Sequence, residues 1–275
     1  MDARLQRRVQ RYGWDKAAAL YEGYWQQQLA PAQDRLLALA ALRPGERVID
    51  VAAGTGLVTF RAAALVGPSG SVLATDISER MVARLAEEAV HREAANVTAR
   101  RTDAEVLDVP EGSFDAALCA LGLMYVPDAV AAMEAMRRAL RPGGRAVVAV
   151  WGARSRCGWA EIFPIVDARV QSDVCPMFFQ LGTGERLRAV LEEAGFEDVS
   201  SERIPSVLHY ESPEDACGAA FEGGPVALAY SRFDEATRAA ARAEYLASIE
   251  SCRKGRAYDV PGEFVIAHGS RRQEA

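Results

Sequence analysis

Short apolar runs alternate with helical stretches through most of this chain, and this alternation is the feature that most constrains its fold. The strand-like runs cover residues 48–51, 71–75, 96–101, 114–121 and 145–151. Strands separated by helices favour a parallel sheet, because parallel strands need long crossover connections. These crossovers are right-handed, which places helices on both faces of the sheet. The sequence therefore predicts an α/β fold.

The stretches between these runs carry the residues that commonly begin and end helices. Gly67 closes a predicted helix over 57–66, and Ser78 and Asp128 stand where N-cap residues begin the next two helices. Beyond residue 151, a helix from Thr183 to Ala194 leads to a sixth strand over 196–204. The last strand is predicted over 263–268.

Two segments depart from the alternation. Residues 1–42 are amphipathic and rich in aromatic side chains, with Pro31 expected to break the helical pattern. Between the last two strands, Ser212 caps one predicted helix and a longer one runs over 234–254. We therefore expect three regions, which are an N-terminal helical lid over 1–42, a core over 43–205 and 260–270, and a helical insertion over 206–259 that caps a ligand pocket.

Composition and charge exclude several classes of protein. The 275 residues carry a formal net charge of -6, which is not the clustered positive charge that nucleic-acid binding needs. No apolar run reaches the length of a membrane span, so we expect a cytoplasmic protein with no membrane span and no nucleic-acid partner. The five cysteines are widely spaced and the three histidines isolated, so we expect no metal site.

The loop after the first strand has the sequence Ala52-Ala53-Gly54-Thr55-Gly56. Glycine has no Cβ, so the backbone at Gly54 and Gly56 can approach a ligand closely, and the free N–H groups of the following helix suit an anionic group. A dinucleotide-binding loop has a third glycine, where this chain has Thr59. The loop therefore favours a nucleoside linked to an amino acid over a dinucleotide.

Acidic residues stand at successive strand ends, where open α/β sheets bind their ligands. Asp50 belongs to the first strand and Asp76 ends the second, and the Asp76 carboxylate can accept hydrogen bonds from both hydroxyls of a ribose. A nicotinamide dinucleotide would satisfy Asp76 equally well. Asp103 and the backbone N–H of Ala104 follow the third strand, and this pair suits the amino group and a ring nitrogen of adenine.

Five segments in this order and spacing resemble the class I S-adenosylmethionine-dependent methyltransferases. They are VIDVAAGTG, TDIS, TDAEVLDVPEGSFD, LGLMYVPD and LRPGGR. The resemblance covers roughly residues 10–205 and is strongest to the branch that contains ubiquinone and menaquinone C-methyltransferases. It implies a Rossmann-like sheet of seven strands with an antiparallel last strand, S-adenosyl-L-methionine as cofactor, and methyl transfer to a small molecule.

The resemblance also assigns roles in cofactor binding. Gly54 and Gly56, with Ala53 between the strand and the first of them, would line the methionine portion; Asp76 would bind the ribose and Asp103 with Ala104 the adenine. Ile77, Met81 and Leu121 would form apolar walls around the adenine ring. From the sequence itself, Tyr21 and Trp25 lie four residues apart and share a helix face, so they are candidates to cover the cofactor. Alanines at 52 and 53 depart from the usual pattern of the family.

The acceptor and its chemistry are left open by the sequence. His209 and Tyr125 are candidate general bases, as are Glu22 and Asp259, and an amine acceptor would need none. We expect an apolar acceptor chamber formed by Phe221, Tyr245, His209 and Tyr125 with the 157–180 segment. O-, N- and C-methylation all remain open, as does a homodimer. The alternatives are a nicotinamide-dependent oxidoreductase and a non-catalytic subunit that binds S-adenosylmethionine.

Overall fold

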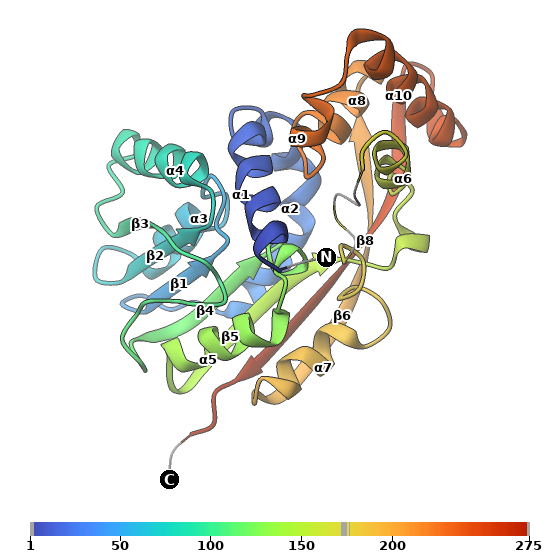
Figure 1. Cartoon of the computed structure of the whole chain (residues 1–275). Helices are drawn as coiled ribbons and strands as arrows, with labels where there is room; N and C mark the ends of the chain where they lie inside the picture. Colours follow the sequence, from blue (N-terminus) through green and yellow to red (C-terminus); the bar gives the residue numbers. More distant parts are fainter. Residues whose placement is uncertain (1–2, 172–174, 176, 274–275) are drawn as a thin grey trace.

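A computed structural model describes residues 3–171, 175 and 177–273. Its sheet has the strand order β3-β2-β1-β4-β5-β8-β6, with β7 beside β8 (Figure 1). The strands are β1 Arg47–Val51, β2 Ser71–Asp76, β3 Val97–Arg101, β4 Phe114–Ala120, β5 Leu140–Trp151, β6 Glu197–Tyr210, β7 Arg253–Lys254 and β8 Ala257–Ser270. Strands β1 to β5 pair in parallel, whereas β8 runs antiparallel between β5 and β6. The predicted sheet is confirmed, with the short β7 added to its seven strands.

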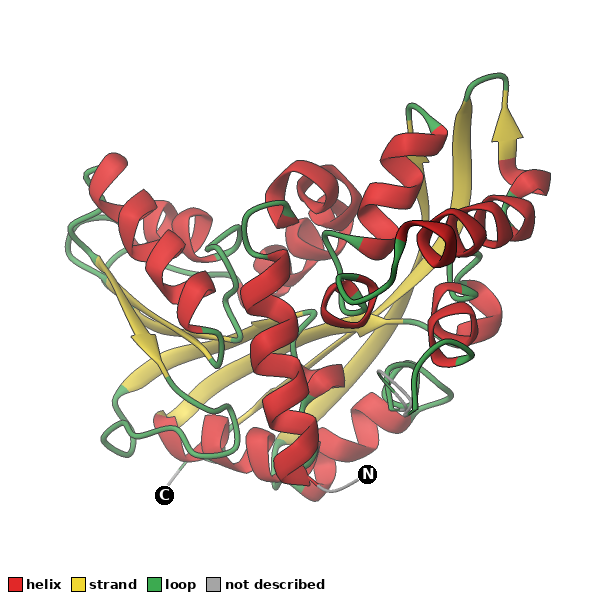
Figure 2. Cartoon of the chain, turned by 45° about the horizontal axis from the view of Figure 1, so that its top comes forward, coloured by secondary structure: helices red, strands yellow, loops and turns green. Residues whose placement is uncertain are grey.

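Helices lie on both sides of the sheet (Figure 2). They are α1 Ala3–Ala17, α2 Tyr21–Ala40, α3 Thr59–Val66, α4 Glu79–His91, α5 Ala129–Ala139, α6 Ile162–Asp167, α7 Arg186–Glu193, α8 Pro213–Phe221, α9 Ala227–Tyr230 and α10 Glu235–Ser248. Helices α3 and α4 connect strands in the direction from β1 to β3 along the sheet, whereas α5 and α7 connect strands in the opposite direction, from β4 to β6. Right-handed crossovers therefore put these two pairs on opposite faces.

The helix caps that the sequence predicts are present. The side chains of Ser78, Asp128 and Ser212 each accept a hydrogen bond from the backbone N–H three residues later. Gly67 and Gly195 follow α3 and α7 with φ of 66° and 83°, which residues with a Cβ rarely adopt. These local signals fix where the helices begin and end.

Pro31 does not break the N-terminal helices as predicted, since α2 continues through it to Ala40. The hydrogen bond that proline cannot donate would go to the carbonyl of Gln27. Both Gln27 and Pro31 are exposed, so water can satisfy that carbonyl. The break lies instead in the turn over residues 18–20 between α1 and α2.

The boundaries of the insertion also differ from the prediction. Strands β6 and β8 pair continuously as far as Tyr210 and Tyr258, well beyond the predicted strand ends. The long helix ends at Ser248, and Arg253 and Lys254 form β7 rather than its last turn. The alternation of exposed and partly buried residues along β6 explains the miss, because a mostly polar strand has no continuous apolar run.

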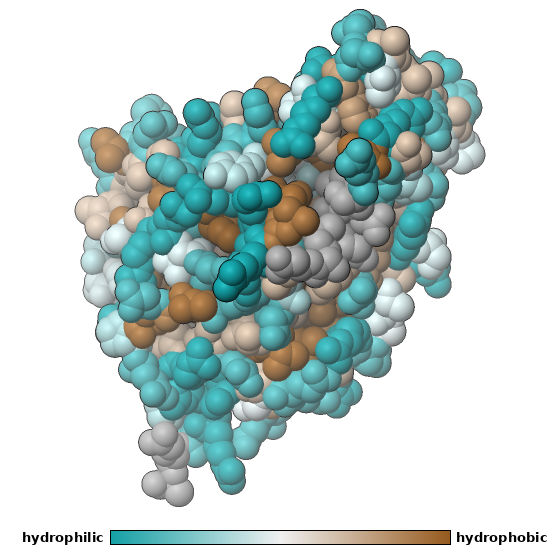
Figure 3. Space-filling view, viewed as in Figure 1, coloured by the Kyte–Doolittle hydropathy of each residue, from teal (hydrophilic) through white to brown (hydrophobic). Residues whose placement is uncertain are grey.

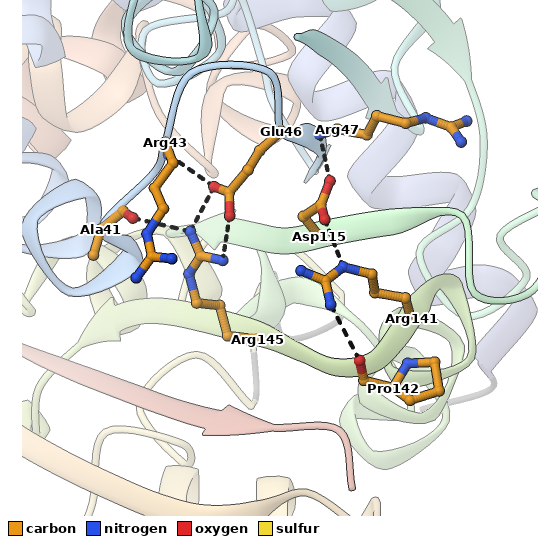
Figure 4. A network of polar contacts seen from close by, with 8 residues as sticks. All are labelled: Ala41, Arg43, Glu46, Arg47, Asp115, Arg141, Pro142 and Arg145. Atoms are coloured by element: carbon orange, nitrogen blue, oxygen red, sulfur yellow. Dashed lines mark hydrogen bonds and ion pairs between the residues drawn. The ribbon is translucent and has the colours of Figure 1, made fainter. Parts of the chain in front are cut away.

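The amino ends of the strands carry a network of ion pairs (Figure 4). The Arg145 guanidinium contacts the Glu46 carboxylate with N–O distances of 2.7 and 3.0 Å and donates to the carbonyl of Ala41. Asp115 accepts hydrogen bonds from the Arg47 backbone at 2.7 Å and from an arginine of β5. This network ties α2, β1, β4 and β5 together at the edge opposite the predicted ligand site.

The helical insertion has a small core of its own. Phe221 stacks on Tyr230 with ring centroids 4.9 Å apart, and Tyr245 meets Phe221 edge to face at 5.6 Å. Helices α8 and α10 lie near the far ends of β6 and β8, whereas α9 packs against α1 (Figure 1). Among the described residues, the helices are all too short or too polar to cross a membrane.

Candidate functional site

A cavity, here named the strand-end cavity, lies at the carboxyl ends of β1 to β4 and holds about 920 Å³ of empty space, open solvent at its mouth included. Loop residues from all four strands line one side. Residues of α1 and α2, including Arg7, Trp14 and Tyr21, line the other. Helix α1 stands between α4 and α9 (Figure 1), so it covers the cavity from outside the sheet.

The turn after β1 forms the floor of the strand-end cavity. Ala52 and Gly54 both have left-handed backbone conformations, with φ of 56° and 59°. The Gly54 N–H donates a 2.9 Å hydrogen bond to Asp76 Oδ2. Gly56 does not line the cavity, and a Cβ at this residue would lie 2.6 Å from the ring of Phe60. Gly56 therefore serves the packing of α3 against the loop, which differs from its predicted contact with the methionine portion.

Asp50 lies under this floor and lines the strand-end cavity. Its Oδ2 accepts a 2.6 Å hydrogen bond from the Thr59 hydroxyl, whereas its buried Oδ1 has no partner. Burial raises the pKa of Asp50 to about 7, although the Thr59 hydrogen bond opposes the shift. Thr59 occupies the position of the third glycine in dinucleotide-binding loops. It thus orients a carboxyl whose second oxygen has no hydrogen-bond partner within the described structure.

Asp76 ends β2 at the middle of the same cavity. The backbone N–H groups of Ser78 and Gly54 donate to its two oxygens at 2.8 and 2.9 Å. Burial raises the pKa of Asp76 to about 6 against these two hydrogen bonds. Each oxygen keeps a further lone pair, so the carboxylate can still accept hydrogen bonds from a diol.

Asp103 and Ala104 lie at the outer end of the cavity, after β3. The Arg7 side chain of α1 reaches over them, with its Nε 3.1 Å from Asp103 Oδ2 and a second ion pair to Glu105. Glu105 is buried and accepts a 2.9 Å hydrogen bond from the Asp128 backbone. Burial raises the pKa of Asp103 and the Arg7 charge lowers it, with a net upward shift.

A second cavity, here named the aromatic chamber, adjoins the strand-end cavity and holds about 340 Å³ of empty space, open solvent included. Its lining is Trp14, Tyr21, Trp25, Leu29, Leu121, Met124, Tyr125, Trp151, Trp159, Phe178 and Pro225. Among these described residues there is no carboxylate, lysine, arginine or histidine. The indole nitrogens of Trp25 and Trp159 are buried and have no hydrogen-bond partner within the described structure.

Trp14, Tyr21, Leu121 and Tyr125 line both cavities, so they form the neck between them. The Trp14 ring stands nearly perpendicular to the two tyrosine rings, with centroids 5.7 Å from Tyr21 and 5.2 Å from Tyr125. Burial raises the pKa of both tyrosines above the ordinary value, so both hydroxyls stay protonated at neutral pH. The neck can donate hydrogen bonds but does not carry charge.

The structure brings together most of the residues predicted to bind the cofactor. Those that line the strand-end cavity are Tyr21, Ala53, Gly54, Asp76, Ile77, Met81, Asp103, Ala104 and Leu121. Trp25 lines the aromatic chamber instead, where its ring is 6.2 Å from Trp151 and 6.4 Å from Trp159. Trp25 is thus separated from the predicted cofactor site by the neck.

His209 lines neither cavity, which contradicts its predicted place beside the acceptor. It pairs with Asp259 across the β6–β8 hairpin, with an Nδ1–Oδ1 distance of 2.7 Å, and its side chain is 52% exposed. The Asp259 hydrogen bond raises the pKa of His209. His209 does lie near the end of β6, as predicted. However, β6 continues past its predicted end at residue 204, and the His209 side chain lies on the outer surface.

Two further members of the predicted chamber lie away from both cavities, whereas the others line a cavity. Phe221 and Tyr245 are fully buried in the insertion and line neither cavity. Tyr125 lines both cavities, and the 157–180 segment contributes Trp159 and Phe178 to the aromatic chamber. Part of that segment, residues 172–174 and 176, lies outside the described residues. The insertion reaches the chamber through Pro225, in the loop before α9.

Several lining residues were not assigned from the sequence. At its strand end Asp50 has no role predicted from the sequence, and Trp14 is one of several aromatic residues in the N-terminal segment. Arg7 and Trp151 had no local signal, because their places depend on how α1 and β5 meet distant strands. The described residues contain no group of three or more His, Cys, Asp or Glu side chains that would hold a metal ion.

Known proteins match both the sequence and the fold. A family model described as a methyltransferase domain matches residues 48–144. The chain is 32% identical over 180 residues to the ubiquinone/menaquinone biosynthesis C-methyltransferase of Ectopseudomonas mendocina. This match covers 59% of this chain and 69% of that enzyme. It is 38% identical over 132 residues to the nocamycin O-methyltransferase of Saccharothrix syringae, covering 48% of this chain and 47% of that enzyme.

The fold also matches solved structures. The structure of the Haemonchus contortus phosphoethanolamine N-methyltransferase 2, in complex with phosphomonomethylethanolamine and S-adenosylhomocysteine, superposes with a TM-score of 0.61. The match has 18% sequence identity and covers 94% of this chain and 58% of that chain. The likeness extends through the N-terminal helices and the insertion, beyond the part that the family model covers.

Proposed function

This chain belongs to the class I S-adenosylmethionine-dependent methyltransferases, and we propose that it methylates an apolar small molecule held in the aromatic chamber. The observation that carries the proposal is that this chamber opens through the neck into the strand-end cavity. Family membership favours this activity over a nicotinamide-dependent oxidoreductase and over a non-catalytic subunit. C- and O-methyltransferases both occur among the relatives, so the atom that is methylated is not decided by similarity.

The strand-end cavity fits the cofactor at three carboxyl groups. The unpartnered Asp50 Oδ1 suits the ammonium group of the methionine portion, since a buried acceptor without a partner is costly. Asp76 suits the ribose diol, and Asp103 with the Ala104 backbone suits adenine. The cofactor supplies an electrophilic methyl group on a positively charged sulfur. Residues of the neck would then surround the point where the methyl group faces the aromatic chamber.

The lining of the aromatic chamber favours an acceptor whose reacting end is flat and uncharged. Rings from Trp25, Trp151 and Trp159 surround it, and a buried ion would have no opposite charge nearby. The unpartnered indole N–H groups of Trp25 and Trp159 belong to this lining, and they suit an oxygen acceptor on the ligand. Alignment with the cofactor and exclusion of water are then the main contributions of the protein.

The acceptor must provide its own nucleophile in this proposal. Among the described residues that line the chamber, the titratable side chains are Tyr21 and Tyr125, and both stay protonated. A protonated tyrosine can orient an acceptor oxygen or nitrogen by donating a hydrogen bond, but it cannot remove a proton. A group that is nucleophilic without first losing a proton, such as a neutral amine, fits this environment.

We further propose that residues 1–42 act as a lid and that the insertion closes the chamber from the side. The buried face of α1 contains Gln6, Gln10 and Gly13 rather than large apolar residues. Little apolar surface therefore holds α1 down, and its main anchors are Arg7 and Asp15, which accepts a 2.6 Å hydrogen bond from the Ser78 hydroxyl. A helix held by polar contacts can detach at a lower cost than one held by a core.

Location and assembly remain proposals. All five cysteines are free, which suits the reducing cytoplasm. A net charge of -6 supports the absence of a nucleic-acid partner. The homodimer stays a prediction.

The proposed function is tested by comparing one variant in each of the two cavities. Asp76→Ala should weaken binding of S-adenosylhomocysteine by about 1.5 to 3 kcal/mol, the range for hydrogen bonds to a charged group. Trp159→Leu should leave that affinity unchanged and lower methyl transfer to a panel of apolar amines and phenols. Asp108→Ala, at an exposed residue outside both cavities, is the control. Calorimetry without binding of either cofactor form at millimolar concentration would contradict the proposal.

A further inference from the structure

The neck between the two cavities has a feature that methyl transfer to an apolar acceptor does not by itself require. Its walls are three aromatic rings, from Trp14, Tyr21 and Tyr125, which come from α1, α2 and the loop after β4. The rings meet edge to face at 5.2 and 5.7 Å rather than in a parallel stack. All three line both cavities, so part of each ring faces empty space.

The position of the neck fixes which part of the cofactor it would contact. Asp50 and Gly54 lie toward one end of the strand-end cavity and Asp103 toward the other, with Asp76 between them. The sulfur of the cofactor connects the methionine portion to the ribose, so it lies between Gly54 and Asp76. Tyr21 is next to this point, because its ring is 3.8 Å from where a Cβ on Gly54 would be.

The charges around the neck leave its aromatic rings as the groups that face the sulfur. Thr59 and backbone N–H groups engage Asp50 and Asp76. Ion pairs of α1 lie at Arg7, toward the adenine end, and at Arg11, which pairs with Glu79 at the start of α4. The faces of aromatic rings carry negative charge and attract cations, most strongly for tryptophan. The sulfur of S-adenosylmethionine is a cation, whereas that of S-adenosylhomocysteine is neutral.

We propose that Trp14, Tyr21 and Tyr125 form a cage that binds the sulfonium cation, with Trp14 as its main member. This inference rests on the proposed function, because it needs the cofactor in the strand-end cavity. The cage selects the charged cofactor over the neutral product, and it loses this attraction once the methyl group has moved. Trp14 then favours product release as well as cofactor capture.

The experiment compares the dissociation constants of the two cofactor forms by calorimetry on the whole chain. Trp14→Leu removes the ring and should weaken S-adenosylmethionine about 5- to 30-fold, the range expected for a desolvated cation–π contact. Binding of S-adenosylhomocysteine should weaken much less, since this ligand has no charge on sulfur. Trp14→Phe keeps a ring and should restore most of the selectivity.

The matched control is Trp159→Leu, which removes a ring of the aromatic chamber outside the neck and should not change the ratio of the two constants. Equal weakening of both ligands by Trp14→Leu would overturn the cage, because Trp14 would then be only a wall of the cavity. Unchanged binding of both would overturn it too. If Trp14→Leu does not fold, Tyr125→Leu takes its place with the same expected selectivity. A wild-type chain that binds neither form contradicts the proposed function itself, and the cage with it, so the two failures are distinguishable.

Discussion

Asp50 and Asp76 are two buried carboxyl groups whose pKa values burial raises to about 7 and about 6. Each lies above the value of an unfolded aspartate, so between about pH 4 and pH 7 the folded chain binds more protons than the unfolded one. The free energy of unfolding without ligand should therefore fall as pH rises through this window. A carboxyl placed to bind a cationic ligand is thus a source of instability when that ligand is absent.

Asp50→Asn should flatten this dependence, because asparagine does not titrate and still accepts the Thr59 hydrogen bond. Relative to the wild-type chain, the variant's free energy of unfolding should be higher at pH 7.5 than at pH 5 by an amount on the order of 1 kcal/mol or more. A shift of one pKa unit corresponds to about 1.4 kcal/mol. Urea denaturation at both pH values measures it. Asp108→Asn at the surface should leave the pH dependence as it is in the wild-type chain. A wild-type free energy of unfolding that rises steadily from pH 5 to pH 7.5 would contradict the raised pKa values.

Ala52 and Gly122 form a second pair at the residue scale. Ala52 has a φ of 56°, which is strained for a residue with a Cβ. Its Cβ occupies the space where a Cβ on Gly122 would lie, so a side chain at either position leaves little room at the other. The Ala52 Cβ has room because residue 122 is glycine.

We expect Gly122→Ala to destabilise the chain by about 1 to 3 kcal/mol, the usual cost of overpacking. In the Ala52→Gly background the same substitution should cost at least 1 kcal/mol less, because the opposing Cβ is gone. Ala52→Gly alone should change stability little, since relief of strain offsets the greater freedom of the unfolded chain. Thermal unfolding of the four variants measures the cycle. Additive effects would show that the two residues do not share this space.

At the scale of elements, helix α1 is the one that we propose to control ligand exchange, because polar contacts hold it over the strand-end cavity. Its two ends are tied to different places beside the strand-end cavity, by Arg7 to Asp103 and Glu105 at the outer end and by Asp15 to the beginning of α4 near the middle. Its outer face exposes Leu5 and Tyr12, and Figure 3 shows apolar residues among hydrophilic ones near the centre of this face. In the proposed lid role, α1 would open when its polar anchors break.

Arg7→Gln should therefore increase the dissociation rate of S-adenosylhomocysteine by about 2- to 10-fold, as expected for loss of a partly exposed ion pair. Hydrogen exchange of α1 amides should increase, and that of β1 and β4 should not. Arg8→Gln is the matched control, because Arg8 lies on the exposed face of the same helix. Equal exchange rates for the two variants would indicate that α1 is a fixed part of the core rather than a lid.

Local signals in the sequence were sufficient for most elements. Ser78, Asp128 and Ser212 cap helices where predicted, because an N-cap depends on a side chain and a backbone N–H three residues apart. The extra length of β6 and β8 was missed because the two strands support each other by pairing, which no single segment encodes. Pro31 was misjudged for a similar reason, since its tolerance in α2 depends on which side of the helix faces solvent.

The two cavities differ in how far the sequence predicts them. The strand-end cavity follows from the order of strands, because the carboxyl ends of parallel strands meet at one edge and bring Asp50, Asp76 and Asp103 together. The aromatic chamber has no such rule. Trp25 and Trp159 are 134 positions apart in sequence yet have ring centroids 6.4 Å apart, through tertiary packing alone. His209 was misplaced because the direction of a long strand end depends on that packing.

At the scale of the whole molecule, the fold separates stability from ligand binding. The amino ends of the strands hold the ion pairs around Glu46 and Arg145, whereas the carboxyl ends hold unpaired and strained groups such as Asp50 and Ala52. Two segments outside the alternating core lie at the carboxyl ends of the strands. One is α1 with α2, and the other is the insertion. The chamber exists only where these segments meet β5 and the loop after β4, so the acceptor site is a property of the assembled chain.

The insertion should therefore be needed for methyl transfer but not for cofactor binding. Tyr210 and Tyr258 are paired on β6 and β8, so residues 211–257 can be replaced by Asn-Gly, which closes a two-residue hairpin. The shortened chain loses Pro225 from the chamber and the contact of α9 with α1, and transfer to any apolar acceptor should stop. The affinity for S-adenosylhomocysteine should change less than about 5-fold, because the carboxyl groups of the strand-end cavity all precede residue 104. That affinity also reports whether the shortened chain is folded. Methyl transfer that persists at the wild-type rate would show that the insertion serves another purpose, such as contact with a second copy of the chain.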